Sequence, residues 1–463
     1  MEVVAQAPQP IIKCYHSIIL NEATQFLYQK FTPNSSDTSG KNLQSYNFER
    51  SLDNFGGSFS FTVKEDTESL YDPFMDKVQP LDVIVISESG YEEKIDFIGV
   101  VTTISVGSIA SNLNKVVTVS GKSIEWLFSF YNINCDIKCT IFNNDEANKM
   151  FKADLANNDG EQGISIKDIV IASIQTFKNQ VSKLEGGTES VISNFLIGDL
   201  INLWFKDDYI EASTEKFAYP ISSNMFDTGK INVIDYIKKL LPSPIYEIFS
   251  YIDDNGNPKL VFRQVPFDNP KAAYTINPTH LTDYTLTRNC EEVYTAFMTY
   301  IEGTDLSPDF YMNLATAKDD KLKGYNFSQP SKEKAAKYGY QLLTCSFVGY
   351  NDKPDAASDN EKIQKMNEDL ERWFSRLDEM YNGDFTLVNY INEKNEKNEQ
   401  IKKAKIGEWL NFAKGLYYVV SEKHSWTFGD NPMINYQVTR GGEYSGSDFK
   451  PIQKLSTVYK EFE

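Results

Sequence analysis

The chain has 463 residues, a formal net charge of −19 and an aromatic content of 13%. This length suggests about three domains, each large enough to bury a core of its own. The aromatic content excludes a disordered acidic tail, and the acidic balance argues against a protein that grips nucleic acid through its phosphates. We therefore expect a folded, acidic, multidomain protein.

Cysteine usage and hydropathy bear on the compartment. Five scattered cysteines do not form a disulfide framework and fit synthesis in a reducing cytoplasm. The first ten residues lack the basic and apolar regions of a secretory signal. The uncharged stretch Phe97–Asn114 holds seven Ser, Thr or Asn residues and two Gly, so we interpret it as two strands and a turn. We expect a soluble protein without stable membrane insertion.

The first third of the chain has the pattern of β-structure. Phe59, Phe61 and Val63 alternate with small polar residues, as on a strand with one apolar face, and Gly56-Gly57 before them permits a turn or bulge. Short strands separated by turn residues are typical of a barrel or a sandwich. The further elements expected here are strands at Leu81–Ile86, Ile95–Ile104 and Val116–Val119, and a short amphipathic helix at Lys122–Tyr131.

The middle of the chain changes to helical spacing and then to a hairpin. Apolar residues at helical intervals predict helices at Ile166–Leu184, Val191–Phe205 and Ile231–Leu241, the last stopped by Pro242. The Asp- and Asn-rich segment 253–257 lies between two apolar runs and predicts a β-hairpin, and it lacks the ligand pattern of an EF-hand. The hairpin strands are expected at Ile245–Ile252 and Lys259–Val265, and strand-like alternation resumes at Arg288–Ile301.

The last part of the chain is expected to contain one long helix and a second β-region. An apolar stripe predicts a helix over Ala356–Tyr381, and such stripes are usually packing faces. The segment Asn392–Lys405 is rich in Asn, Glu and Lys. It is either a solvated loop or a docking loop that orders against a partner.

A weak internal repeat links the two β-regions. The strand series Leu81–Val85, Phe97–Val101 and Val117–Gly121 is followed, in the same order, by Glu408–Phe412, Tyr417–Val420 and Gln437–Gly441. We therefore predict an α+β, mainly β fold with two tube-like β-barrels and inserted helical and hairpin regions. The expected divisions are a first barrel at 1–131, a helical insertion at 132–241, a central hairpin and strand domain at 242–355, and a helix with the second barrel at 356–463.

No catalytic, cofactor-binding or metal-binding residues can be assigned. Gly121-Lys122-Ser123 matches the end of a phosphate-binding loop. Such a loop also needs a glycine at position 116, where this chain has valine, so a strand end is the better interpretation. The three histidines His16, His280 and His424 lie far apart, and Cys135 and Cys139 have no second pair to complete a zinc site. His424 lies in a strand pattern that favours a hydrogen-bonded role. No Gly-x-Ser-x-Gly motif supports a serine hydrolase.

The order of motifs resembles that of phage tail baseplate hub proteins, a family related to the N-terminal half of VgrG. The resemblance runs from about Tyr46 to Gly442, and 143–230 matches nothing recognisable. It rests on degenerate motifs in the expected order: Gly57-Ser58-Phe59-Ser60-Phe61, Ser120-Gly121-Lys122-Ser123, Tyr246-Glu247-Ile248-Phe249, Leu260–Phe267, Asp369–Phe374, Gly383–Leu387, Ile406–Trp409, Leu416–Ser425 and Val438–Gly441.

The resemblance implies a homotrimeric hub with two tube-like barrels per subunit, so that six similar barrels match a hexameric tail tube on one face and a trimeric spike on the other. It implies contacts with a tail tube protein ring, a spike on a separate polypeptide and other baseplate proteins. DNA would pass through the channel without specific binding, which a net charge of −19 would favour. The protein would belong to the virion tail baseplate, would be made in the host cytoplasm, and would not be an enzyme.

Two alternatives belong to other functional classes. A tail-associated cell-wall hydrolase would need converging acidic residues, with the segment Asn143–Lys230 as a possible place for them. A host-binding tail protein would bind a receptor or glycan as an isolated chain.

Overall fold

The computed structural model of the chain describes residues 10–20, 23–31, 41–52, 54–65, 78–89, 94–108, 115–130, 132, 164–167, 170–171, 173–175, 205–214, 216–217, 232–301, 325–327, 332–347, 357–389 and 402–452.

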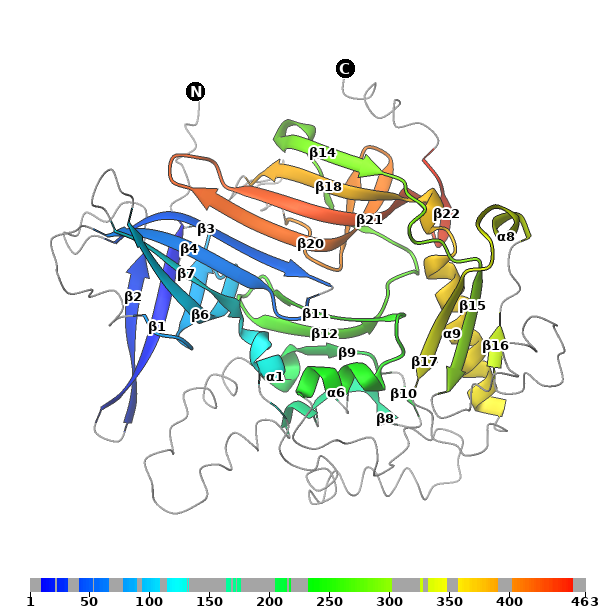
Figure 1. Cartoon of the computed structure of the whole chain (residues 1–463), viewed down its shortest axis with the longest axis horizontal. Coiled ribbons are helices and arrows are strands. Elements are labelled where there is room, and N and C mark those ends of the chain that lie inside the picture. The colour runs from blue at the N-terminus through cyan, green and yellow to red at the C-terminus, as the bar shows by residue number, and fades with distance from the viewer. Residues whose placement is uncertain are drawn as a thin grey trace, which may run out of the picture.

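A large, curled, mainly antiparallel sheet dominates the structure (Figure 1). It has 14 strands, and its main path runs β14-β18-β21-β20-β3-β4-β7-β6-β5-β1-β2. The strands on this path are β1 (Ile11–Leu20), β2 (Ala23–Phe31), β3 (Lys41–Ser51), β4 (Ser58–Glu65), β5 (Val83–Ser87), β6 (Phe97–Ser108), β7 (Lys115–Ser123), β14 (Leu281–Thr287), β18 (Tyr381–Val388), β20 (Gly415–Thr427) and β21 (Met433–Ser445). β13 (Ala272–Thr275), β19 (Trp409–Phe412) and β22 (Asp448–Lys450) pair beside this path.

Two sets of five strands in this sheet have the same topology. The N-terminal unit consists of β3, β4, β5, β6 and β7, and the C-terminal unit consists of β14, β18, β19, β20 and β21. Numbered along the chain, the strands of each unit lie in the spatial order third, fourth, fifth, second, first, and all neighbours are antiparallel. The weak repeat in the sequence therefore corresponds to two units of one topology.

The residue pairing of the two units also agrees. The first strand has a register shift between Leu43 and Ser45 in one unit and between Leu281 and Asp283 in the other. The fourth strand has one between Val101 and Thr103, matched by that between Val419 and Ser421. The C-terminal unit has two further shifts, at 381/383 and 416/418. Because bulges occupy defined positions in a strand, the matched pairs align the units residue by residue.

The turn before the third strand is repeated as well. Leu81 and Gly407 both have a positive φ, of 74° and 78°. The next residue in each unit is acidic, and its carboxylate accepts a hydrogen bond from the backbone N–H three residues before it. Asp82 accepts from Gln79 at 2.7 Å and Glu408 accepts from Lys405 at 2.8 Å. A left-handed residue followed by a carboxylate thus closes both turns.

Each unit buries one face of its alternating strands. The core of the N-terminal unit contains Phe48, Phe59 and Phe61, and that of the C-terminal unit contains Phe385 and Tyr436. These side chains are 2% exposed or less, so the alternation seen in the sequence does identify the buried face.

A second layer lies against this sheet and carries the central hairpin (Figure 1). The hairpin strands are β11 (Tyr246–Ile252) and β12 (Pro258–Gln264), joined by the expected turn, and β9 (Ile210–Ala212) pairs in parallel with β12. α6 (Val233–Leu240) confirms the third predicted helix. The side chain of Asn232 caps its N-terminus by accepting from the Asp235 N–H at 2.8 Å.

A third group of elements surrounds the long helix. α9 (Ala357–Phe374) packs against a small sheet of β15 (Ala296–Ile301), β16 (Tyr325–Phe327) and β17 (Leu342–Phe347). The remaining short elements are η1 (Ile124–Trp126), α1 (Leu127–Phe130), η2 (Asp207–Tyr209), η4 (Pro278–His280), η6 (Leu377–Glu379) and α8 (Lys332–Tyr338), and β8 (Ile164–Ser165) pairs with β10 (Lys216–Phe217).

Several expected boundaries are wrong. The helix expected over Ala356–Tyr381 ends at Phe374. The expected end is too late because Leu377 and Met380, in the turn before β18, are also buried and continue the apolar spacing of the helix. Of the two strands and a turn expected in 97–114, the structure describes one long strand, β6, which extends to Ser108, and 109–114 lie outside the described residues. The expected helix at Lys122–Tyr131 begins only at Ile124, and the strand within Arg288–Ile301 begins at Ala296.

The mainly β fold is confirmed, but two separate barrels are not seen in the described part of the chain, where both β-regions share one sheet. The helix expected at Val191–Phe205 lies almost wholly outside the described residues, as does most of Ile166–Leu184. The division into four regions stays a prediction. Within the described ranges, no helix is both long and apolar enough to cross a membrane.

Candidate functional site

The two units join along a single pair of strands. Residues Ser45–Ser51 of β3 pair antiparallel with Ser421–Thr427 of β20 over seven residue pairs. β20 is long enough to pair with β19 through its first residues and with β3 through its last ones. β3, the first strand of the N-terminal unit, therefore lies beside β20 from the point where β19 ends, and this pairing joins the two units into one sheet.

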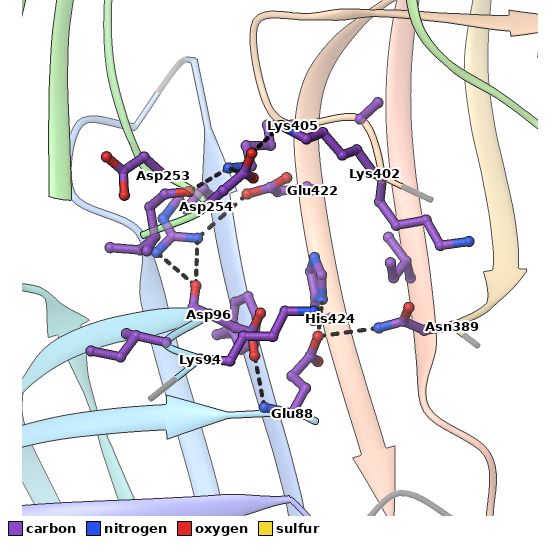
Figure 2. A pocket seen from close by; sticks show the side chains of 17 residues that line it. Glu88, Lys94, Asp96, Asp253, Asp254, Asn389, Lys402, Lys405, Glu422 and His424 are labelled. Carbon is purple, nitrogen blue, oxygen red and sulfur yellow. Dashed lines mark hydrogen bonds and ion pairs between the residues drawn. The ribbon is translucent and has the colours of Figure 1, made fainter. Parts of the chain in front are cut away.

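A pocket at this junction contains a buried polar cluster (Figure 2). At its centre is the carboxylate of Glu88, which is 3% exposed. Its Oε1 accepts a hydrogen bond from the Tyr46 hydroxyl at 2.9 Å, and its Oε2 accepts one from Asn389 Nδ2 at 3.1 Å. The Nδ1 of His424 lies 2.9 Å from the same Oε2. Glu88 thus connects β3, β20 and the residue that follows β18.

His424 is held by stacking and by charge. Its ring lies 4.4 Å from that of Phe48, its direct partner in the β3–β20 pairing, with an interplanar angle of 15°. Burial disfavours the imidazolium, but the charge of Glu88 and its hydrogen bond outweigh this effect, so the pKa of His424 is raised above its ordinary value. The residue has the hydrogen-bonded role that its strand pattern favoured.

Asp96 adds a second acid to the cluster. Its Oδ2 accepts a hydrogen bond from the backbone N–H of Glu88 at 2.8 Å. Burial, with the nearby charge of Glu88, raises the pKa of Asp96 to about 7. The junction therefore holds two groups, Asp96 and His424, whose pKa values are both raised above their ordinary values.

A buried ion pair crosses the junction beside the cluster. Arg50 of β3 lies opposite Glu422 of β20 in the strand register, and its guanidinium is 3.4 Å from the Glu422 carboxylate. The same guanidinium donates to the backbone carbonyl of Asp96 and lies 4.7 Å from the centre of the Phe97 ring. With both side chains about 5% exposed, losing either partner would leave a buried charge unpaired.

The rim of the pocket ties the hairpin to the segment before β19. Asp254, in the hairpin turn, forms ion pairs with Lys402 and Lys405, and Lys405 also donates to the Ile252 carbonyl at 2.7 Å. The hydrogen bond from Lys402 lowers the pKa of Asp254. These two lysines belong to the expected loop at Asn392–Lys405, whose residues 392–401 lie outside the described part.

A separate buried link joins the hairpin to β20. Glu247 of β11 accepts a hydrogen bond from the Tyr418 hydroxyl at 2.6 Å and one from Arg263 Nε at 2.7 Å. Burial raises the pKa of Glu247, although Arg263 and Tyr418 act in the opposite direction. The C-terminal unit is thus attached to the second layer through a satisfied buried carboxylate.

The arrangement has the chemistry of a joint between elements. Each acidic side chain of the cluster already has a hydrogen-bond partner on another element, so its hydrogen-bonding capacity holds the units together. In the parts of the chain that the structure describes, no group of three or more His, Cys, Asp or Glu side chains could hold a metal ion. Gly121-Lys122-Ser123 forms the end of β7, as the alternative to a phosphate loop predicted.

Sequence reasoning missed most of this cluster. Glu88, Asp96 and Arg50 carry no motif. Glu88 and Asp96 lie close together in the sequence, after β5 and before β6, whereas Arg50 of β3 and His424 of β20 reach them from distant parts of the chain. His280 and His424 are in separate places, and Cys135 and Cys139 lie outside the described residues. The three described cysteines are free thiols.

No family model matches this sequence, and no curated protein does so either. Among solved structures, the 43 kDa tail protein of prophage MuSo2 from Shewanella oneidensis has 10% identity and a TM-score of 0.47, covering 93% of this chain and 98% of that one. A tail protein from Neisseria meningitidis has 9% identity and a TM-score of 0.47, covering 93% and 96%. A Francisella PdpA-VgrG complex has 10% identity and a TM-score of 0.40, covering 96% and 55%.

Proposed function

We propose that the chain is the structural hub of a phage tail baseplate or a related injection machine. In this role it is a symmetry adaptor that joins a hexameric tail tube to a trimeric spike and surrounds a channel. The observation that carries the proposal is the duplication within the sheet, where two five-stranded units share strand order and the positions of two bulges.

The duplication suits a mismatch of symmetry. A hexameric ring repeats its contacts six times, whereas a trimer repeats them three times. Three copies of a chain with two similar units present six similar surfaces, and a head-to-tail contact between copies closes into a ring by rotation. Within such a ring, each unit would supply one tube-like barrel segment.

The junction cluster supports the same role. A subunit that bears load between tube and spike needs its two units fixed in orientation, and the Glu88 cluster with the Arg50–Glu422 pair provides fixed contacts across their seam. No catalytic step is assigned to these residues. The proposed partners are other copies of the chain, the tube protein ring, a separate spike protein and other baseplate proteins. DNA would pass through without specific contacts, as the net charge of −19 favours.

The proposal is tested by the mass of the assembled protein. Analytical ultracentrifugation of the full chain, alone and with tail tube or spike protein, is expected to give a species of three times 52.8 kDa before the partner's mass is added. A chain that stays monomeric under all of these conditions would contradict the hub. Loss of cell-wall turbidity on adding the purified chain would instead favour the hydrolase alternative.

A further inference from the structure

The alignment of the two units identifies counterparts at the junction. In the C-terminal unit, residues 421–425 of β20 pair with β21 on one edge, and residues 421–427 pair with β3 on the other. Their counterparts in the N-terminal unit are residues from Thr103 onward in β6, because the bulge at 101/103 matches the one at 419/421. The counterpart of β3 is β14, the first strand of the C-terminal unit.

In the described part of the chain, both counterparts present an edge without a strand on it. Thr103–Ser108 pair with β7 on one side, while β5 reaches only to the residues before the bulge, so within the described ranges no strand covers their other side. Among the described strands, β14 ends the path of the sheet and pairs with β18 alone. Both edges lie at the surface, and Val106 of β6 is 45% exposed, one of few large apolar side chains that are.

We propose that β14 of one copy pairs with the 103–108 segment of β6 in the neighbouring copy, and that this contact repeats the β3–β20 junction between copies. The proposal rests on the homotrimeric hub above and names the surface that would close it. Transferring the internal register gives antiparallel pairs between Ser105 and Thr287, between Val106 and Leu286, and between Gly107 and Thr285.

The side chains at these positions suit the pairing. Val106 would be covered by Leu286, which in the single chain is only partly buried against the core of its own unit. Arg288 is the counterpart of Arg50, and each lies over an aromatic ring, at 5.3 Å from Tyr381 and 4.7 Å from Phe97. Opposite Arg288 the register places Ile104, where the internal junction has Glu422. The contact between copies would therefore be the less polar of the two.

The two edges also explain closure. Each copy carries one β6 edge and one β14 edge, which differ from each other, so the contact is head-to-tail. A closed ring would pair every such edge. Open edges would remain on a free monomer, and exposed edge strands tend to pair with other chains.

The register is tested by disulfide trapping in the full chain. In a background with Cys135, Cys139 and Cys290 replaced by Ser, the double substitution Ser105→Cys and Thr287→Cys places two thiols opposite each other. Mild oxidation is expected to give covalent dimers and trimers on denaturing gels. The matched control, Thr103→Cys with Thr285→Cys, uses the same strands and faces but is offset by four residues, about 13 Å. We expect it to cross-link at least about tenfold more slowly, because a disulfide needs Cα atoms within about 7 Å.

The outcomes separate this inference from the proposed function. Sedimentation velocity could show a trimer for both double variants while neither of them cross-links or both cross-link equally. That result would overturn the register and leave the hub proposal standing. A chain that never assembles would contradict the hub itself. As a second measurement, Val106→Asp is expected to shift the trimer–monomer equilibrium toward monomer at least about tenfold, given the burial of its side chain in the contact. Adding Leu286→Lys is expected to restore assembly by pairing the charges, and failure of this rescue would also count against the register.

Discussion

Asp96 and His424 have raised pKa values for different reasons. For Asp96 the main cause is burial of the carboxylate, whereas for His424 it is the neighbouring charge of Glu88, which overcomes burial. Despite these different causes, the linkage has the same sign for both. Each group binds its proton more tightly in the native chain than in the unfolded one, so each contribution to the free energy of unfolding decreases as pH rises through the shifted range.

A pH prediction follows for Asp96. Its pKa is about 7 in the native chain, against about 4 for an unfolded aspartate. The unfolding free energy of the wild type is therefore expected to fall between pH 5 and 8 by more than that of Asp96→Asn, by about 2–3 kcal/mol. Denaturant unfolding at several pH values measures this difference.

The control for that comparison is Asp430→Asn, at an exposed turn between β20 and β21. Asp430 lies outside the cluster, so this variant makes the same change from carboxylate to amide without touching the junction. If Asp96→Asn follows the wild type as closely as this control does, the acid at the junction is not titrating in the neutral range, and the account of the cluster is wrong.

Gly407 occupies the repeated turn and has two reasons to be glycine. Its φ is +78°, and an added Cβ would lie 2.5 Å from Cζ of Phe249. Gly429 has a φ of +93° with nothing within 4 Å of a Cβ, so it shares the backbone requirement alone. Gly429→Ala is expected to cost about 1 kcal/mol and Gly407→Ala about 2 kcal/mol more, measured by thermal unfolding. Equal costs would show that Phe249 can move aside.

At the scale of elements, one hydroxyl in β20 links the hairpin to the C-terminal unit. Tyr418→Phe removes the hydroxyl that donates to Glu247, leaving a buried carboxylate short of a partner. We expect a loss of about 1–3 kcal/mol in unfolding free energy. Tyr417→Phe, one residue earlier and equally buried, carries none of these bonds and is the matched control. A loss no larger than the control's would exclude this link as a main attachment of the hairpin.

Local patterns in the sequence predicted some of these elements well. The hairpin around Asp253-Asp254 and the helix ended by Pro242 depend on neighbours in the chain, so composition and spacing were sufficient. The end of the long helix was wrong because buried spacing continues through Leu377 into a turn. Local signals carry this kind of ambiguity at element boundaries.

The pairing of β20 with β3 could not be predicted in the same way. Alternation shows which face of a strand is buried, but it does not show which strand lies beside it, and β20 exchanges β19 for β3 along its length. The same pairing places His424 beside Phe48, within reach of Glu88. The weak repeat was the only signal in the sequence that the two regions are related, and it did not reveal the shared bulges.

At the scale of the whole molecule, the proposed hub depends on a duplicated half-sheet, through which three copies would present six similar units. In the proposed ring, the internal junction would be the template for the contact between copies, with polar groups at one seam and mainly apolar groups at the other. The two seams should differ in their response to pH, because Asp96 and His424 lie only at the internal one.

The most direct measurement of this claim is electron cryomicroscopy of the assembled particle, reconstructed without imposed symmetry. For the proposed hub we expect a three-fold ring in which six five-stranded units follow one another at near-equal rotations, with β3–β20 and β14–β6 seams alternating. A ring with another number of chains, or one in which the N-terminal and C-terminal units occupy unrelated positions, would contradict it.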